Sequence, residues 1–235
     1  MASALIYCPS GGGKTVNSTR VLTGERGRNL LLCSDNSSVV LKNFDRPNLD
    51  IQTVKHWLNK DKTGVTQECF HDQFDEAVES KKYDNIIVDN ISDLFDMSIL
   101  ELKDSGKFND NRQAYQAVYE GIKRLVRKAG QLDCDVILTA WAEQQQIVLP
   151  TGEQAMRITP KLPLKILDNV CGLVNVVAYI NTATKPDGAP GWYYITEGKP
   201  TLYAKDQIAC RKTCMPEDIF QPKEAKKDTQ KEEKK

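Results

Sequence analysis

Residues 4–15 read Ala4-Leu5-Ile6-Tyr7-Cys8-Pro9-Ser10-Gly11-Gly12-Gly13-Lys14-Thr15, an apolar run that leads directly into a glycine-rich turn. Small residues let successive backbone N–H groups curl around a phosphate, and a helix that begins at the turn adds its positive dipole end. In such loops the Lys ammonium reaches the β- and γ-phosphate oxygens, and the Thr hydroxyl coordinates Mg²⁺. The stretch therefore predicts a phosphate-binding loop between a strand and a helix.

This loop departs from the usual G-x-x-x-x-G-K-[ST] pattern at its first position, where Cys8 replaces glycine. That glycine opens the loop and is the most replaceable of the set, so the prediction stands. The alternative is a flexible glycine-rich hairpin followed by an incidental Lys-Thr. We expect the nucleoside triphosphate to contact residues that run through the loop into the next helix, namely Pro9, Ser10, Gly11, Gly12, Gly13, Lys14, Thr15 and Val16.

A second element of the site is the apolar run Asn85-Ile86-Ile87-Val88-Asp89, which ends in a carboxylate. In nucleotide-binding proteins of this kind an acid at the end of a buried strand holds the Mg²⁺ shell through water. A strand also often ends in Asp because Asp suits turns. Its place downstream of the glycine-rich loop favours the first interpretation, with Thr15 and Asp89 as the Mg²⁺ ligands.

Two more polar residues follow predicted strands. The strand that begins at Asn29 ends in Asp35, which we expect to polarise the attacking water as a general base, or else to form a turn with the residues after it. The strand over 134–139 should lie between the first strand and the strand that ends in Asp89. It presents Thr139, or Glu143 a little further on, as a sensor of the γ-phosphate; Trp141 could equally be a core or hinge aromatic.

The chain as a whole is consistent with one globular domain. It has 235 residues, of which 40% are hydrophobic, and a formal net charge of zero. We expect a domain over 1–220 and a charged, disordered tail over 221–235. Bulk charge does not favour nucleic acid, so such binding would need a local basic patch or several subunits.

Location follows from what the sequence lacks. No apolar run approaches the roughly 18 to 20 residues that cross a bilayer, and the first strand leaves no room for a signal peptide. We therefore expect a cytoplasmic protein without a membrane partner. The seven cysteines are irregularly spaced, as in a reducing compartment. A zinc site built from Cys69, His71, Cys210 and Cys214 lacks the paired spacing of zinc motifs.

The hydrophobic pattern predicts alternating strands and helices. Buried strands are expected over 3–8, 29–34, 85–89 and 134–139, and helices over 15–23, 67–81 and 111–129. Repeated strand–helix–strand order implies a mostly parallel, doubly wound α/β sheet with ligands at the carboxyl ends of its strands. From about residue 172 the pattern changes to antiparallel hairpin strands at one edge of the sheet, over 173–181, 191–196 and 201–205, with turns at 185–188 and 198–200.

A long polar connection, 143–161, is expected to have no regular structure apart from a turn at Thr151-Gly152. Arg157, Lys161 and Lys165 give it and its flank positive charge that suits the phosphates of a single nucleic-acid strand. The alternative is a mobile, solvated loop without a ligand.

Taken together, these pieces resemble the RecA-like core, and in particular the phage nucleotide-binding proteins that act as recombination or single-strand annealing ATPases. The resemblance spans about residues 3–215. It rests on the segments 8–15, 31–35, 86–92, 137–141 and 203–206. Its implied cofactors are ATP and Mg²⁺, and its implied partners are single-stranded DNA, further copies of the chain in a ring or filament, and a single-strand-binding protein. If the chain is phage-encoded, its location would be the cytoplasm of a bacterial host.

The resemblance also implies roles for individual residues. Asp35 fills the place of the family's catalytic Glu, with a shorter side chain. Lys205 matches the first cation of a Lys-x-Arg pair that acts on the neighbouring subunit's nucleotide, but Gln207 stands where the Arg would be. Arg211 or Lys212 would then have to replace it. The basic residues of the long connection correspond to the region that lines the DNA channel.

Two other functions fit the same motifs. A small-molecule or nucleotide kinase would share the phosphate-binding loop, but such kinases usually carry an Arg-rich lid, and the corresponding stretch here is rich in Gln. A module that binds ATP to assemble, without hydrolysing it, is favoured by the departures at Asp35 and Gln207.

Overall fold

The computed structural model describes residues 1–57, 68–107, 110–184 and 190–222. Its strands are β1 (Ser3–Cys8), β2 (Asn29–Cys33), β3 (Leu49–Thr53), β4 (Asn85–Asp89), β5 (Asp135–Val148), β6 (Gln154–Pro160), β7 (Val176–Thr184), β8 (Pro190–Ile195), β9 (Lys205–Asp206) and β10 (Thr213–Cys214). Its α-helices are α1 (Lys14–Ser18), α2 (Phe70–Ser80), α3 (Ile91–Asp104), α4 (Asn111–Ala129) and α5 (Leu164–Leu173), and two 3₁₀-helices are η1 (Asn36–Asn43) and η2 (Pro216–Asp218).

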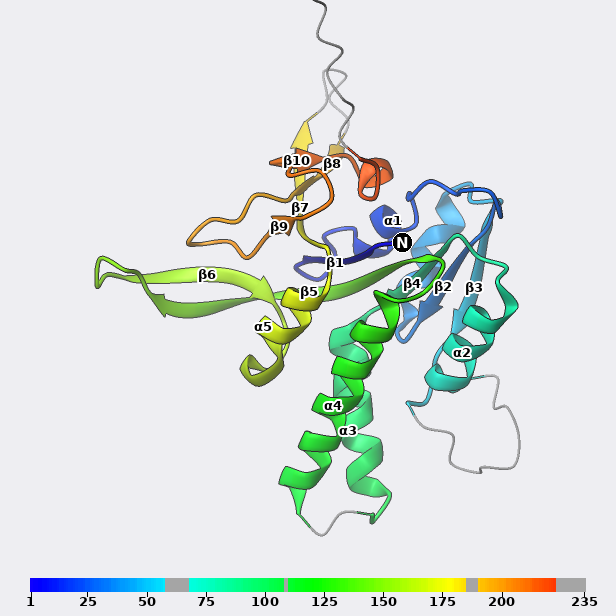
Figure 1. The fold of residues 1–235 in the computed structure, drawn as a ribbon, viewed down its shortest axis with the longest axis horizontal. Coiled ribbons are helices and arrows are strands. Elements are labelled where there is room, and N and C mark those ends of the chain that lie inside the picture. The colour runs from blue at the N-terminus through cyan, green and yellow to red at the C-terminus, as the bar shows by residue number, and fades with distance from the viewer. Residues whose placement is uncertain (58–67, 108–109, 185–189, 223–235) are drawn as a thin grey trace, which may run out of the picture.

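The strands of the described residues form one ten-stranded sheet in the order β10-β8-β7-β1-β5-β4-β2-β3, with β6 added to β5 and β9 to β7 (Figure 1). The six strands from β7 to β3 are parallel to their neighbours in that row. At the other end β8 pairs with β7, and β10 with β8, in antiparallel fashion. The predicted α/β class is therefore confirmed, with a mostly parallel sheet and antiparallel strands at one edge.

The register brings the predicted functional strands together at their carboxyl ends. Cys8 at the end of β1 lies opposite Trp141 of β5, and β5 separates β1 from β4, as predicted. On the other side of β4, Asp89 lies opposite Cys33, the last residue of β2. The ends of β1, β2 and β4 and the middle of β5 are thus held side by side by backbone pairing.

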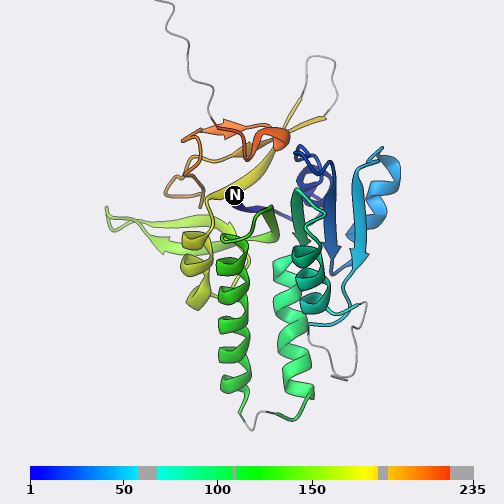
Figure 2. The same cartoon turned by 45° about the vertical axis from the view of Figure 1, so that its right-hand side comes forward.

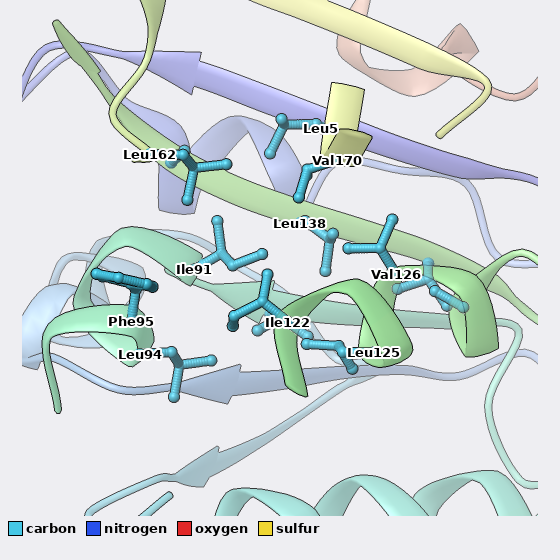
Figure 3. Packing of buried hydrophobic residues seen from close by; sticks show 14 of the residues in the cluster. Leu5, Ile91, Leu94, Phe95, Ile122, Leu125, Val126, Leu138, Leu162 and Val170 are labelled. Atoms are coloured by element: carbon cyan, nitrogen blue, oxygen red, sulfur yellow. The ribbon is translucent and has the colours of Figure 1, made fainter. Parts of the chain in front are cut away.

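Helices cover both faces of the sheet, because side chains alternate between two hydrophobic clusters. Leu5 of β1 and Leu138 of β5 belong to the larger cluster, with α2, α3, α4 and α5. Their sequence neighbours Ile6 and Ile137 point to the other face of the sheet and belong to the smaller cluster, with α1 and η1. A strand that is buried on both faces needs a continuous apolar run, and this is the pattern that the sequence shows. Figure 3 shows Ile122 of α4 and Ile91 of α3 in the cluster that contains Leu138.

The helices predicted over 67–81 and 111–129 are confirmed as α2 and α4. In α4 the apolar residues Ala114, Val118, Ile122 and Leu125 are buried on one face, as their spacing predicts. Helix α3 was not predicted, although it begins at Ile91, two residues after Asp89. It packs beside α4, and the two run as a long antiparallel pair away from the sheet (Figure 2).

The prediction for 143–161 is wrong. Strand β5 continues to Val148 and pairs with β6 from Ala142↔Pro160 to Val148↔Gln154, so the polar connection is a two-stranded ribbon that extends from the body (Figure 1). Its turn is closed by backbone hydrogen bonds between Leu149 and both Glu153 and Gly152, in agreement with the predicted turn. These strands were missed because one face of the ribbon is exposed and the other only half-buried, so the sequence needs no regular apolar alternation there.

Three other boundaries differ from prediction. Helix α1 ends at Ser18 rather than near Thr23, because the hydroxyls of Ser18 and Thr19 bond back to the carbonyl of Thr15. The strand expected from residue 173 begins at Val176, because α5 occupies 164–173. The strand expected over 201–205 overlaps the structure only at Lys205, since strand β9 covers Lys205–Asp206 and pairs with the first residues of β7.

Some predictions lie outside the described residues: the turn at 185–188 and most of the charged tail, from residue 223 onward. Over the described part of the chain, no helix combines the length and the apolar character that a membrane span requires.

Candidate active site

Three hydroxyl groups converge on the carboxylate of Asp89, which is 1% exposed. Thr15 at the start of α1 donates to Oδ2 over 2.6 Å, and Ser37 of η1 donates to the same oxygen over 3.0 Å. Thr139 of β5 donates to Oδ1 over 2.5 Å. The structure therefore brings the predicted residues Thr15, Asp89 and Thr139 into direct contact at the carboxyl ends of the strands.

The glycine-rich loop beside this cluster has little room for larger residues. Gly11 and Gly13 have φ values of +76° and +89°, a backbone conformation that favours glycine. A Cβ on Gly12 would lie 2.5 Å from the Cys8 Sγ. A Cβ on Gly13 would lie 2.9 Å from Nδ2 of Asn17 and 3.2 Å from Nε1 of Trp192, on β8. The loop is thus shaped by glycine at each of these positions.

Lys14 and Cys8 lie on the inner side of the loop. Lys14 is 7% exposed, and its ammonium donates to the carbonyls of Pro9, over 3.3 Å, and Cys8, over 3.5 Å. Burial raises the pKa of the Cys8 thiol to about 11, although the Lys14 charge lowers it. Cys8 is therefore a neutral packing residue against Gly12, and its size is accommodated where the usual pattern has glycine.

Asp35 lies beside the cluster and caps η1. Its Oδ1 accepts a hydrogen bond of 2.8 Å from the Ser37 backbone N–H, which is the turn geometry that the sequence allowed. Its Oδ2 accepts a bond of 3.0 Å from the side-chain amide of Asn90. Asn90 also caps α3, since its side-chain oxygen accepts from the Asp93 N–H over 2.8 Å.

Burial dominates the electrostatics of Asp89 and Asp93. Burial raises the pKa of Asp89, while the hydrogen bonds from Thr139, Thr15 and Ser37 lower it and the nearby Asp35 charge raises it. Burial likewise raises the pKa of Asp93, which also faces Asp35 and Asp89. Several carboxylates are therefore held close together, and a cation at this position would relieve their repulsion.

The residues present fit Mg²⁺ and a nucleoside triphosphate. The hydroxyl of Thr15 and the carboxylate of Asp89 are hard oxygen ligands of the type that Mg²⁺ prefers. They lie next to a glycine cradle that a Cβ would fill at Gly12 and Gly13. Lys14 brings a positive charge to the same loop.

The C-terminal cations have local partners. Lys205 donates to the Gly172 carbonyl at the end of α5 over 3.1 Å, and burial lowers the pKa of its ammonium. Arg211 bonds to the buried Asp206 and to the carbonyls of Asp218 and Ile219, so its guanidinium is engaged within its own subunit. Lys212 is exposed and pairs with Glu197 at 3.2 Å. Arg211 and Lys212 were the two candidates to replace the missing Arg. The guanidinium of Arg211 is already bonded within its own subunit, so it is the less suitable of the two.

The three basic residues predicted to meet nucleic acid lie at the ribbon and just after it. The Arg157 guanidinium lies 4.5 Å from the centre of the Tyr203 ring, and the Lys161 ammonium lies 4.9 Å from that of Trp141. Lys165 is exposed in the first turns of α5. Glu143, the alternative sensor, lies at the base of the ribbon and accepts a hydrogen bond from Gln145, whereas Thr139 contacts Asp89.

Sequence reasoning missed Ser37 and Asn90 as parts of this site. Asn90 directly follows Asp89, and an Asn before an apolar helical pattern is an N-cap signal that could have found both α3 and its cap. Ser37 had no comparable signal, because η1 brings it to Asp89 only in three dimensions. Within the described ranges, no group of three or more His, Cys, Asp and Glu side chains is arranged to hold a metal ion, and this covers the residues of the zinc alternative.

Comparison with known proteins gives a family match. A family model described as an AAA domain matches residues 1–208. A search of curated proteins found no match.

Similar solved structures include three proteins that are each 14% identical to this chain. A prototypical ATPase from the type III secretion system of pathogenic bacteria gives a TM-score of 0.47 over 77% of this chain and 51% of that one. The flagellar accessory protein FlaH from Methanocaldococcus jannaschii gives 0.43 over 90% and 83%. The assembled ATPase EscN of the enteropathogenic E. coli type III secretion system gives 0.45 over 77% and 43%. The chain thus spans about half the length of the first of these proteins.

Proposed function

The chain belongs to the AAA domain family, and we propose that it is a Mg²⁺-dependent ATPase that assembles on single-stranded DNA and promotes phage-type recombination or strand annealing. The observation that carries the ATPase part is the convergence of Thr15, Thr139 and Ser37 on the buried Asp89, directly beside the glycine-rich loop. The α/β domain over 1–220 would be the ATPase unit.

Bound Mg²⁺ would neutralise charge on the β- and γ-phosphates. Thr15 and Asp89 would hold the ion, and the loop amides from Pro9 to Val16 would surround the phosphates. Lys14 would exchange the carbonyls of Cys8 and Pro9 for phosphate oxygens, which are stronger partners for an ammonium. Thr139 would fix the orientation of Asp89, and Asp35 would orient the attacking water.

The test is ATP hydrolysis by the full chain, measured as phosphate release with Mg²⁺ and with a chelator. The Thr15→Ser variant keeps the hydroxyl and should retain most of the rate, whereas Thr15→Val should lose it. Equal rates for Thr15→Val and the parent, or a rate that survives the chelator, would contradict the proposal.

One observation favours a second candidate, a module that binds ATP to assemble without hydrolysing it. Asp35 has a local structural role, since its Oδ1 accepts the Ser37 backbone N–H and caps η1. Light scattering would detect assembly that depends on ATP. Such assembly with no phosphate release would select this candidate over the ATPase.

The DNA part of the proposal is supported by the ribbon and its flank. Lys161 and Lys165 follow the ribbon and are exposed, and the ribbon presents polar residues such as Gln144 and Gln146 to solvent. Charged contacts to phosphates weaken steeply with salt. The ATPase rate should therefore rise with single-stranded DNA, and this stimulation should fall across a salt series. If single-stranded DNA did not change the ATPase rate at low salt, the DNA part of the proposal would be excluded and the ATPase part would stand.

Assembly into a ring or filament would complete the site through the neighbouring subunit. Lys205 is the proposed cation in trans, and it would have to leave the Gly172 carbonyl to reach a neighbour's nucleotide. Mixing Lys205→Ala subunits with Lys14→Ala subunits tests this: each subunit type supplies what the other lacks, so mixed assemblies should recover activity. No recovery would exclude the trans role of Lys205.

A further inference from the structure

Asn90 is fully buried between the two acids of the site, and each of its polar groups has a partner. Its backbone N–H donates to the Ser34 hydroxyl over 3.2 Å. Its side-chain oxygen accepts from the Asp93 N–H over 2.8 Å, and its side-chain nitrogen donates to Asp35 Oδ2 over 3.0 Å. Asn90 therefore connects the end of β4, the start of α3 and the loop after β2.

The orientation of this amide follows from its neighbours. A backbone N–H can only donate, so the atom that faces Asp93 must be the side-chain oxygen. The NH₂ group then necessarily faces the Asp35 carboxylate, which can only accept when ionised. The two hydrogen bonds determine the amide orientation together, and no flipped arrangement satisfies both partners.

Capping of α3 requires only the acceptor half of the side chain. Ser, Thr and Asp cap helices as well as Asn does, because each offers an oxygen to the first turn. The donor half of Asn90 is used instead by Asp35. The remaining oxygen of Asp35 is held by the Ser37 N–H, so the two bonds together fix the plane of the carboxylate.

We propose that Asn90 is a positioning residue for hydrolysis, whose side-chain amide holds the Asp35 carboxylate in the orientation that directs the attacking water. This inference rests on the proposed ATPase function. An amide suits the role because it donates to Asp35 without adding a further negative charge beside Asp89 and Asp93. Loss of the donor would leave the carboxylate held at Oδ1 by the Ser37 N–H, with Oδ2 no longer fixed.

The test separates positioning from capping. Asn90→Ser keeps a capping oxygen but removes the amide NH₂ group that reaches Asp35, in exchange for a shorter hydroxyl. The kcat should therefore fall about tenfold, within the range that a positioned base contributes, while the KM for ATP stays within about twofold. Asn90→Thr is a second variant with the same expectation. Asp110→Ala is the matched control: it removes the cap of α4, where the Asp110 carboxylate accepts from the Arg112 N–H, and should lower the melting temperature without changing kcat.

A double-mutant cycle with Asp35→Asn shows whether Asn90 acts through Asp35. If it does, Asn90→Ser should lower kcat in the parent but cause no further loss in the Asp35→Asn background. The free energies of unfolding of the same four proteins, without nucleotide, should also be non-additive, because the two side chains are bonded to each other in the folded chain.

The outcomes are distinct. An unchanged kcat in Asn90→Ser, equal losses in both backgrounds, or additive unfolding free energies would each overturn the role of Asn90 while leaving the ATPase proposal intact. A parent protein that hydrolyses no ATP would overturn the proposed function, and the role of Asn90 with it.

Discussion

Thr139 and Val148 belong to the same strand, β5, yet their surroundings are opposite. Thr139 is 0% exposed and bonds to Asp89, whereas Val148 is 70% exposed near the tip of the ribbon. The first half of β5 is parallel to β1 and β4 and covered on both faces, and the second half pairs only with β6. One strand therefore serves two regions: the buried cluster around Asp89 and the mostly polar ribbon.

The comparison shows that the two regions depend on different forces. The cluster is held by the core beneath it and by hydroxyl-to-carboxylate bonds in a site shielded from water. The ribbon is held by its own backbone pairing, and isolated two-stranded ribbons are marginally stable in water. Substitutions in the cluster should therefore affect both stability and catalysis, and those in the ribbon mainly binding.

The largest difference in stability is expected between Leu138 and Val148. Leu138→Ala removes a fully buried side chain next to Thr139 and should lower the free energy of unfolding by about 2 to 5 kcal/mol. Val148→Ala, in the exposed half of the strand, should change it by less than about 0.5 kcal/mol. Chemical denaturation of both variants measures this. Similar losses for the two would mean that the ribbon is packed as firmly as the core.

The next largest effect is on activity. Lys14→Ala should lower kcat for ATP hydrolysis by about 100- to 1,000-fold, because a preorganised positive group at the phosphates acts mainly on the transition state. The folded state should persist, as measured by circular dichroism. Lys123→Ala, which removes an ammonium paired with Glu120 on the surface of α4, is the control and should keep the parent rate. A Lys14→Ala protein as fast as the parent would refute the phosphate-binding assignment.

Removal of one hydroxyl from the cluster should have a smaller effect. Thr139→Val keeps the shape but leaves Asp89 Oδ1 without that donor, at a cost of about 1 to 3 kcal/mol in unfolding free energy. Thr53→Val changes an exposed threonine at the end of β3 and should be nearly neutral. If the two variants were equally stable, the bond from Thr139 to Asp89 would contribute nothing to the fold.

The smallest effect concerns a carboxylate outside both regions. Burial raises the pKa of Asp50, but hydrogen bonds from Arg28, Lys82 and Tyr83 outweigh it and lower the pKa to about 2. Since the pKa in the folded chain is below the ordinary value, the ionised Asp50 stabilises the fold above about pH 4, and this contribution is lost as the pH falls toward 2.

Asp50→Asn should therefore be less stable than the parent at neutral pH by at most about 1 kcal/mol. The effect is small because the ion pairs of Asp50 with Arg28 and Lys82 are partly exposed and screened by water. The difference should shrink as the pH falls below 4, in urea denaturation at several pH values. A difference that stays constant down to pH 2 would show that charge at Asp50 does not contribute.

Local patterns predicted the elements with strong periodicity. The amphipathic spacing of α4 and the apolar runs of β1, β2 and β4 depend on residues close together in sequence, and all four were located correctly. Strand β3 was missed because it is a half-exposed edge strand without an apolar run. The ribbon was missed because its strands are polar and are formed by backbone pairing between β5 and β6.

The same division applies to the site. Lys14, Thr15 and Asp89 could be found from sequence, because a phosphate-binding loop and an acid at the end of a buried strand each have a local pattern. Ser37 and the contact between Asn90 and Asp35 could not, because they depend on how η1 and α3 return to the sheet.

The sequence by itself determined the glycine-rich loop, the buried strands and the residue types that suit phosphate and Mg²⁺, since spacing and side-chain chemistry are local properties. The tertiary structure alone decided which of these residues meet. The register of β1, β5 and β4 brings Thr15 and Thr139 to Asp89, and the commitment of Arg211 to Asp206 removes it from the set of free cations. Such contacts join positions far apart in the chain, and long-range pairing and packing determine them.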